Sequence, residues 1–116
     1  MADAQFDAAA LIREFGDEVL IAELARLLID HADEQVSAVH DAVASGNAAL
    51  LKSAAHKIKG GMGTFGALPV TRLAMALEAI GRNGHVNGAD ILAAQLEGEV
   101  RALCDGARAW LAHRAA

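Results

Sequence analysis

Residues that build β-sheets are scarce in this sequence. Its 116 residues include three Phe, one Trp, no Tyr and a single Pro. The hydrophobic share of 54% comes mainly from Ala and Leu, which lose little free energy on entering a helix, whereas strands favour β-branched and aromatic residues. The composition therefore predicts an all-α fold, and the length fits one domain spanning residues 1–116.

The chain also lacks the features of secreted, disulfide-bonded and membrane proteins. Cys104 is its only cysteine, which excludes an intrachain disulfide and a thiolate metal cage, and we expect it to be a small core residue. No apolar run approaches the roughly 20 residues that a membrane span needs. The first residues, Met-Ala-Asp-Ala-Gln, lack the basic and apolar parts of a signal peptide. We therefore expect a cytoplasmic protein without membrane contact.

Positive charge is too scarce overall for general nucleic-acid binding, because the formal net charge is −5 and such binding needs a basic surface. The distribution of charge is uneven, however. The stretch between Asp41 and Glu78 has no acidic residue but holds four cations. These cations are Lys52, Lys57, Lys59 and Arg72. A local cationic surface on an acidic protein indicates an acidic partner or a phosphate.

Apolar residues at helical spacing predict five helices with short connections. A short first helix begins after Asp7, which can cap it, and ends at Gly16. The four long helices are expected from Asp17 to Ser45-Gly46, from Asn47 to Phe65, from about Pro69 to a break at Gly81-Arg82-Asn83-Gly84, and from Asn87 or Ala89 to the C-terminus. We expect an antiparallel up-and-down four-helix bundle preceded by the short helix.

Helical geometry places His56 on the outer side of the third predicted helix, about 160° around the helix axis from Ile58 at the centre of the apolar stripe. Its neighbours on that side are Ala49, Lys52, Ser53, Lys59, Gly60 and Gly63. A glycine within a helix costs about 0.5 to 1 kcal/mol. Gly60 therefore indicates that the space beside His56 is kept empty for a reason other than helix stability.

This pattern suits phosphoryl transfer to an imidazole nitrogen, because neutral imidazole is a competent nucleophile near neutral pH. Lys59, three residues on, shares the side of His56 and can pair with phosphoryl oxygens, whereas Lys57 is turned away by about 100°. A simpler interpretation stays open at this point. His56 can be an ordinary solvated histidine, with Gly60-Gly61 as a helix C-cap followed by a loop.

Three motifs resemble the signature of histidine phosphotransfer (HPt) domains of bacterial multistep phosphorelays. They are Ala55-His56-Lys57-Ile58-Lys59-Gly60, then Thr64-Phe65-Gly66-Ala67, and, after Val70 and Leu73, the pair Leu77-Glu78. The resemblance covers nearly the whole chain. Two departures are Ile58 in place of the usual Leu, and a Gly61-Met62-Gly63 run that is richer in glycine than the family pattern.

The resemblance implies a bundle that accepts a phosphoryl group on His56 from an aspartate of a receiver domain and passes it to another receiver. Lys59 is then the phosphate-side lysine and Gly60 the steric opening, with Lys57, Gly63 and Thr64 in supporting positions. Thr64 is the nearest polar candidate to hydrogen-bond the second imidazole nitrogen.

The resemblance further implies a phosphocarrier without kinase activity or a cofactor of its own, because the receiver supplies the aspartate and Mg²⁺. We expect a monomer whose partners are the receiver domains of response regulators or hybrid sensor kinases. A docking surface is expected on the second and third helices near His56.

Other functions have weaker support in the sequence. Gly61-Met62-Gly63-Thr64-Phe65-Gly66 matches G-x-G-x-x-G, but a dinucleotide-binding motif must follow a strand, and a helical stripe precedes this one. His31 with Glu34 is the only i, i+3 pair of a His and a carboxylate, so we expect no metal site. Two alternatives remain: a bundle that docks a receiver or kinase without accepting phosphate, and the phosphoacceptor domain of a chemotaxis-type kinase.

Overall fold

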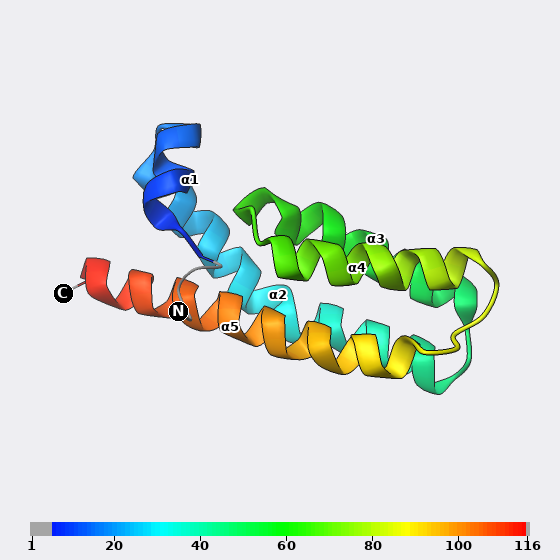
Figure 1. Ribbon diagram of the computed structural model, residues 1–116. Coiled ribbons are helices and arrows are strands. Elements are labelled where there is room, and N and C mark those ends of the chain that lie inside the picture. The colour runs from blue at the N-terminus through cyan, green and yellow to red at the C-terminus, as the bar shows by residue number, and fades with distance from the viewer. Residues whose placement is uncertain (1–5, 116) are drawn as a thin grey trace.

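The computed structural model describes residues 6–115, which contain helices and connecting turns but no strand (Figure 1). The elements are α1 (Ala8–Phe15), α2 (Glu18–Ala44), α3 (Ala48–Met62), the short 3-10 helix η2 (Gly63–Phe65), α4 (Leu68–Arg82) and α5 (Ala89–Ala115). The predicted all-α class is confirmed. Within these residues no helix combines the length and the apolar character that crossing a membrane requires.

Local capping sets the beginnings of the first three helices. Asp7 accepts a hydrogen bond from the Ala10 amide, and Asn47 accepts one from the Leu50 amide. Asp17 accepts hydrogen bonds from two amides at the start of α2. Each side chain satisfies an amide that has no partner within its helix. The three predicted caps are confirmed.

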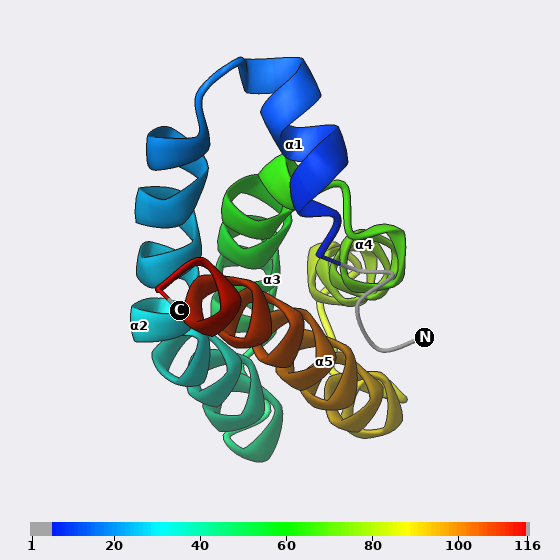
Figure 2. The ribbon, with the colours of Figure 1, turned by 90° about the vertical axis from the view of Figure 1, so that its left-hand side faces the viewer.

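Four long helices enclose the core. α2 contacts α3 and α5, and α4 contacts the same two helices. Figure 2, a view from the end where α1 and the C-terminus lie, shows these four helices around a common centre. The largest fully buried side chains come from all four, and they are Ile21, Val39, Leu51, Ile58, Val70, Leu77, Leu96 and Leu103.

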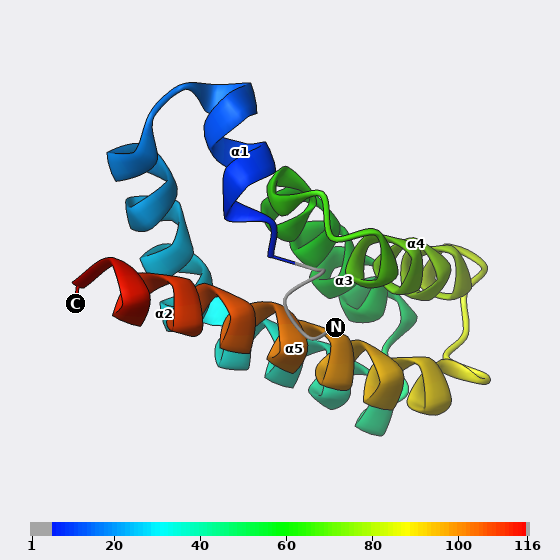
Figure 3. The same ribbon diagram turned by 60° about the vertical axis from the view of Figure 1, so that its left-hand side comes forward.

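The helix α1 closes one end of the molecule (Figure 3). The ring of Phe6, just before α1, lies 5.8 Å from the ring of Phe65 in η2 and 5.8 Å from that of Trp110 in α5, measured between centroids. These contacts connect the start of the chain to both η2 and the last helix. Tilted aromatic pairs of this kind are worth about 0.5 to 1.5 kcal/mol beyond the area they bury.

The end of α3 differs from the sequence prediction. The helix was expected to continue to Phe65, but it ends at Met62, and the chain then forms η2 and turns at Gly66 with φ of 65°. Phe65 is nevertheless buried as its place in the apolar stripe required. The tighter 3-10 turn allows this because it rotates the chain by more per residue than an α-helix does.

Gly81 also has a different role from the one predicted. It was expected to begin the break after the fourth helix, but it lies inside α4, which continues to Arg82. A Cβ on Gly81 would lie 2.7 Å from the carbonyl oxygen of Ala48 and 2.7 Å from the amide nitrogen of Lys52. Gly81 therefore allows the backbones of α3 and α4 to approach each other closely.

Candidate functional site

His56 lies in the second half of α3 with its side chain 66% exposed. The outward orientation predicted from helical geometry is confirmed. One imidazole nitrogen, Nδ1, lies 2.8 Å from Oε2 of Glu78 on α4. The site is thus built between two helices, and its second residue comes from 22 positions further along the chain.

Glu78 is a buried carboxylate with three cationic or titratable neighbours. Its side chain is only 6% exposed. Besides His56, Lys59 donates to Oε1 at 2.7 Å, and the Arg82 guanidinium lies 3.4 Å from Oε2. The hydrogen bond from Lys59 is the main reason that the pKa of Glu78 lies below its ordinary value, and it outweighs burial, which acts in the opposite direction. Glu78 is therefore ionised at neutral pH.

An ionised Glu78 decides which nitrogen of His56 carries the proton. A carboxylate accepts hydrogen bonds but cannot donate them, so Nδ1 of the neutral ring must be the donor. The lone pair of the neutral imidazole is then on Nε2. Since the side chain is largely exposed, the arrangement holds the ring by one nitrogen and leaves the other as an accessible nucleophile.

Lys59 is held near His56 and keeps N–H donors that do not bond Glu78. An ammonium group has three N–H donors, and the contact with Glu78 takes one of them. Two donors remain, and the lysine side chain stays 32% exposed. Lys59 and His56 thus share the Glu78 carboxylate, and the hydrogen bond from Lys59 lowers the pKa of Glu78.

The surface beside His56 is open. A Cβ on Gly60 would have no atom within 4 Å, and the same is true of Gly61 and Gly63. Packing inside the protein therefore gives no reason for glycine at these positions, in contrast to Gly81. The helix surface at Gly60, Gly61 and Gly63 is thus open space.

Two of the predicted supporting residues do not contact the His56 and Glu78 pair. Lys57 is exposed and lines a hollow between α2 and α3. Thr64 is exposed in η2, where it lines hollows facing α1 and α2. Thr64 was only a candidate to hydrogen-bond the second imidazole nitrogen, and the structure pairs Nδ1 with Glu78 instead.

Glu78 is the residue that sequence reasoning missed. It entered only as the end of the Leu77-Glu78 motif. The available signal was its position: it follows the buried Leu77 by one residue and lies about 100° from it, beside the side of α4 that packs on the core. A carboxylate so close to a helix's buried side needs a partner, and the sequence offers Arg82 one turn further on and the lysines of α3.

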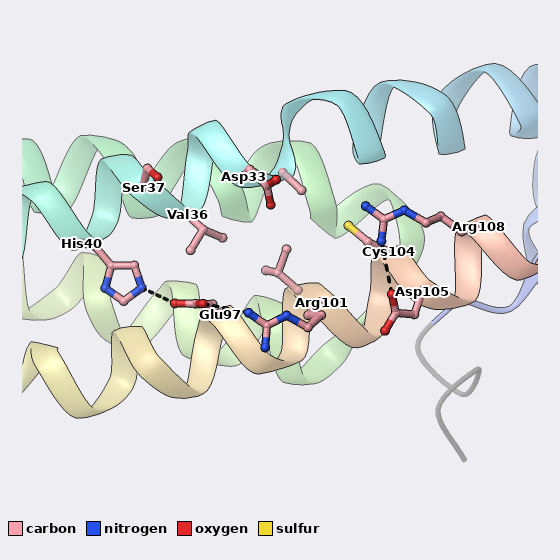
Figure 4. Close-up of a pocket in the computed structure, with 11 residues that line it drawn as sticks. Asp33, Val36, Ser37, His40, Glu97, Arg101, Cys104, Asp105 and Arg108 are labelled. Atoms are coloured by element: carbon pink, nitrogen blue, oxygen red, sulfur yellow. Dashed lines mark hydrogen bonds and ion pairs between the residues drawn. The ribbon is translucent and has the colours of Figure 1, made fainter.

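A second polar cluster lies between α2 and α5 (Figure 4). There Nε2 of His40 lies 2.7 Å from Glu97, which also accepts a hydrogen bond from Arg101 at 2.9 Å. Cys104 lines the same hollow and is buried, as predicted. Burial raises the pKa of its thiol, so the reactive thiolate is disfavoured. Among residues 6–115, no group of three His, Cys, Asp or Glu side chains is arranged to hold a metal ion.

Comparisons with known proteins agree with this geometry. The family model of the Hpt domain matches residues 23–110, which include α3 and α4. The crystal structure of histidine-containing phosphotransfer protein B (HptB) from Pseudomonas aeruginosa PAO1 is similar, with a TM-score of 0.82 and 25% sequence identity over 95% of this chain and 96% of that one. No curated protein sequence gives a significant match. The chain therefore belongs to the Hpt domain family, and its role is histidine phosphotransfer in a phosphorelay.

Proposed function

We propose that His56 is the residue that carries the phosphoryl group, and that it accepts this group from an aspartate of one receiver domain and passes it to an aspartate of another. The observation that carries the proposal is the pairing of Nδ1 with the buried, ionised Glu78. This pairing leaves Nε2 unprotonated on an exposed ring.

The transfer step follows from that arrangement. The lone pair of Nε2 attacks the phosphorus of the aspartyl phosphate, an N–P bond forms, and the P–O bond to the aspartate breaks. The aspartate leaves as a carboxylate. The proton stays on Nδ1, where the negative charge of Glu78, 2.8 Å away, offsets the positive charge that the ring gains. The return transfer reverses these bonds.

Lys59 and Gly60 help to accommodate the incoming phosphoryl group. Lys59 can donate to phosphoryl oxygens while it holds Glu78, and Gly60 leaves room for the partner's active site to close over the ring. Phosphoryl transfer depends mainly on positioning and on neutralising charge. The catalytic aspartate and Mg²⁺ are supplied by the receiver, so this chain needs no kinase activity of its own.

Several further properties belong to the same proposal. The four long helices form the antiparallel up-and-down bundle of a single phosphotransfer domain over residues 1–116, with α1 as an additional N-terminal helix. The protein acts as a cytoplasmic monomer and binds neither nucleic acid nor membranes. Lys57, Gly63 and Thr64 form part of the surface that the receiver covers.

A phosphotransfer assay tests the central point. The chain is mixed with a receiver domain labelled on its aspartate, and the labelled bonds are sorted by acid lability. We expect label on the wild-type chain and none on His56→Gln, with the circular dichroism spectrum unchanged. His113→Gln, which replaces another exposed histidine, is the matched control and should accept label normally. Acid-labile phosphate on His56→Gln would refute the assignment, and a chain that binds receivers without ever taking label would be a docking module.

A further inference from the structure

The segment that follows His56 by one helical turn has few side chains to hold it in place. Residues 60–66, called the glycine segment below, include four glycines: Gly60, Gly61, Gly63 and Gly66. A glycine within a helix weakens it relative to alanine, because the unfolded backbone has more freedom to lose. The buried side chains of the segment are Met62 and Phe65. A region with so few buried apolar contacts opens more easily than the rest of the fold.

One of these two anchors, Phe65, is contacted by Phe6, which precedes α1. The two ring centroids lie 5.8 Å apart, and the ring of Phe6 lies 5.8 Å from that of Trp110 in α5. Trp110 is fixed in turn by Arg114, whose guanidinium lies 5.4 Å from the ring centroid and whose Nε donates to Glu18 at 3.0 Å. Phe6 therefore joins the glycine segment to the last helix and, through it, to the beginning of α2.

The helix α1 lies across the same end of the bundle but gives η2 little further support (Figure 3). Leu11 is the buried residue of α1, and the helix contacts chiefly α2. A hollow of about 450 Å³, lined by Phe15 among others, lies between α1 and η2. Because the two helices do not pack closely there, the ring contact of Phe6 carries much of the connection between them.

The imidazole has a separate support. Its Nδ1 is paired with Glu78 of α4, and Lys59 holds the other oxygen of the same carboxylate. None of these contacts involves η2 or α1. The chemistry of His56 and the order of the glycine segment therefore depend on different parts of the fold, and a substitution can alter one without the other.

We propose that Phe6 is a positioning residue for phosphotransfer. Its ring, placed between Phe65 and Trp110, holds η2 against the core and so keeps the glycine segment in the arrangement over which a receiver's active site closes. Without this ring the imidazole stays paired with Glu78, but the receiver meets a partly opened segment and binds less tightly. The inference rests on the proposed function of His56. The competing account is that Phe6 adds only to overall stability.

Three positions separate the two accounts. Phe6→Ala removes the ring, and Phe6→Leu removes it but keeps an apolar side chain. Phe15→Ala is the matched control, because Phe15 is a phenylalanine of the neighbouring helix that is 41% exposed. Val39→Ala is the control for overall stability, because Val39 is fully buried in α2 and is not part of the aromatic cluster.

Three measurements are made on each variant. Hydrogen exchange followed by NMR reports on the amides of Gly63 and Gly66, which donate to the carbonyl oxygens of Lys59 and Gly63. Transfer from a receiver domain that phosphorylates the wild-type chain gives KM and kcat. Labelling of His56 with phosphoramidate, a small donor that needs no protein surface, reports on the imidazole alone.

In Phe6→Ala we expect the Gly63 and Gly66 amides to exchange at least about tenfold faster, because the segment opens locally. KM should rise about fivefold, as it does when the binding-competent state falls to about a fifth of the population. The value of kcat and the phosphoramidate labelling should stay as in the wild-type chain. Phe6→Leu should show smaller changes of the same kind.

The two controls should behave differently from the Phe6 variants. Phe15→Ala should match the wild-type chain in all three measurements. Val39→Ala should unfold at a lower urea concentration but keep the wild-type KM and the wild-type exchange of the two glycine amides, because a local opening does not involve the buried side of α2.

Wild-type exchange and KM in both Phe6 variants would overturn the inference. A rise of KM in Val39→Ala equal to that in Phe6→Ala would also overturn it, because the effect would then follow overall stability. Loss of phosphoramidate labelling in Phe6→Ala would contradict the separate support of the imidazole. Failure of the proposed function looks different, because the wild-type chain would then take no label on His56 from any receiver.

Discussion

Replacing Glu78 by Gln tests how the protein prepares His56 for reaction. The change keeps the size of the side chain but turns one of its two acceptor atoms into a donor. Lys59 can only donate, and its Nζ lies 2.7 Å from Oε1, so the oxygen of the introduced amide is drawn to Lys59. The amide nitrogen then faces Nδ1 of His56 and donates to it.

That exchange reverses the preferred tautomer of the imidazole. With a donor facing Nδ1, the ring proton moves to Nε2, and the exposed nitrogen loses its lone pair. A hydrogen bond to a charged group contributes about 1.5 to 3 kcal/mol, and each 1.4 kcal/mol is about a factor of ten. We therefore expect transfer to slow by about 10- to 100-fold at saturating receiver, while the affinity for the receiver stays nearly constant.

Two measurements check this prediction together. Rapid-quench kinetics give the transfer rate, and ¹⁵N NMR of the imidazole ring reports which nitrogen is protonated. A merely structural role for Glu78 would leave the tautomer unchanged. Wild-type transfer with an Nε2-protonated ring would refute the reasoning, and so would wild-type rates with the original tautomer.

Three further outcomes follow from the same geometry. Gly60→Ala should raise the free energy of unfolding by about 0.5 to 1 kcal/mol because its Cβ enters open space. Gly60→Leu should stay folded but slow phosphoryl transfer. A transfer rate equal to that of the wild-type chain would contradict the steric role of Gly60. Gly81→Ala should lower the free energy of unfolding by about 1 to 3 kcal/mol, because its Cβ would meet backbone atoms at 2.7 Å. Urea denaturation measures this change. Unchanged stability would contradict the close approach of α3 and α4. The pKa of Glu78 is lowered from its ordinary value of 4.5, so its stabilisation is complete above that pH and is lost as the pH falls through the lower pKa of the folded state. Wild-type protein should therefore lose stability more steeply than Glu78→Gln as the pH falls below 4.5. Parallel curves of stability against pH would contradict the ion pairs of Glu78.

Local interactions explain why the helix beginnings were predictable. The side chains of Asp7, Asp17 and Asn47 hydrogen-bond amides two or three residues further on, so the information lies within one helical turn. The exposure of His56 was predictable for a similar reason, because the apolar stripe of α3 fixes which side of the helix faces the core.

Tertiary contacts explain what was missed. The Nδ1 partner of His56 lies 22 residues away on α4. Nothing in the local sequence of α3 indicates this residue, and the sequence offered Thr64 only as a candidate. Gly81 presented the same difficulty. Glycine near a helix end usually marks the end, and only the approach of Ala48 and Lys52 reveals that it is needed inside α4.

The most direct test of the account is the identity of the phosphorylated atom. The wild-type chain is phosphorylated by a receiver domain and studied by ³¹P and ¹⁵N NMR with ¹⁵N-labelled histidine. The account predicts one phosphohistidine, at Nε2 of His56, with the proton on Nδ1 retained in its hydrogen bond to Glu78. Phosphorylation at Nδ1, or on any residue other than His56, would contradict it.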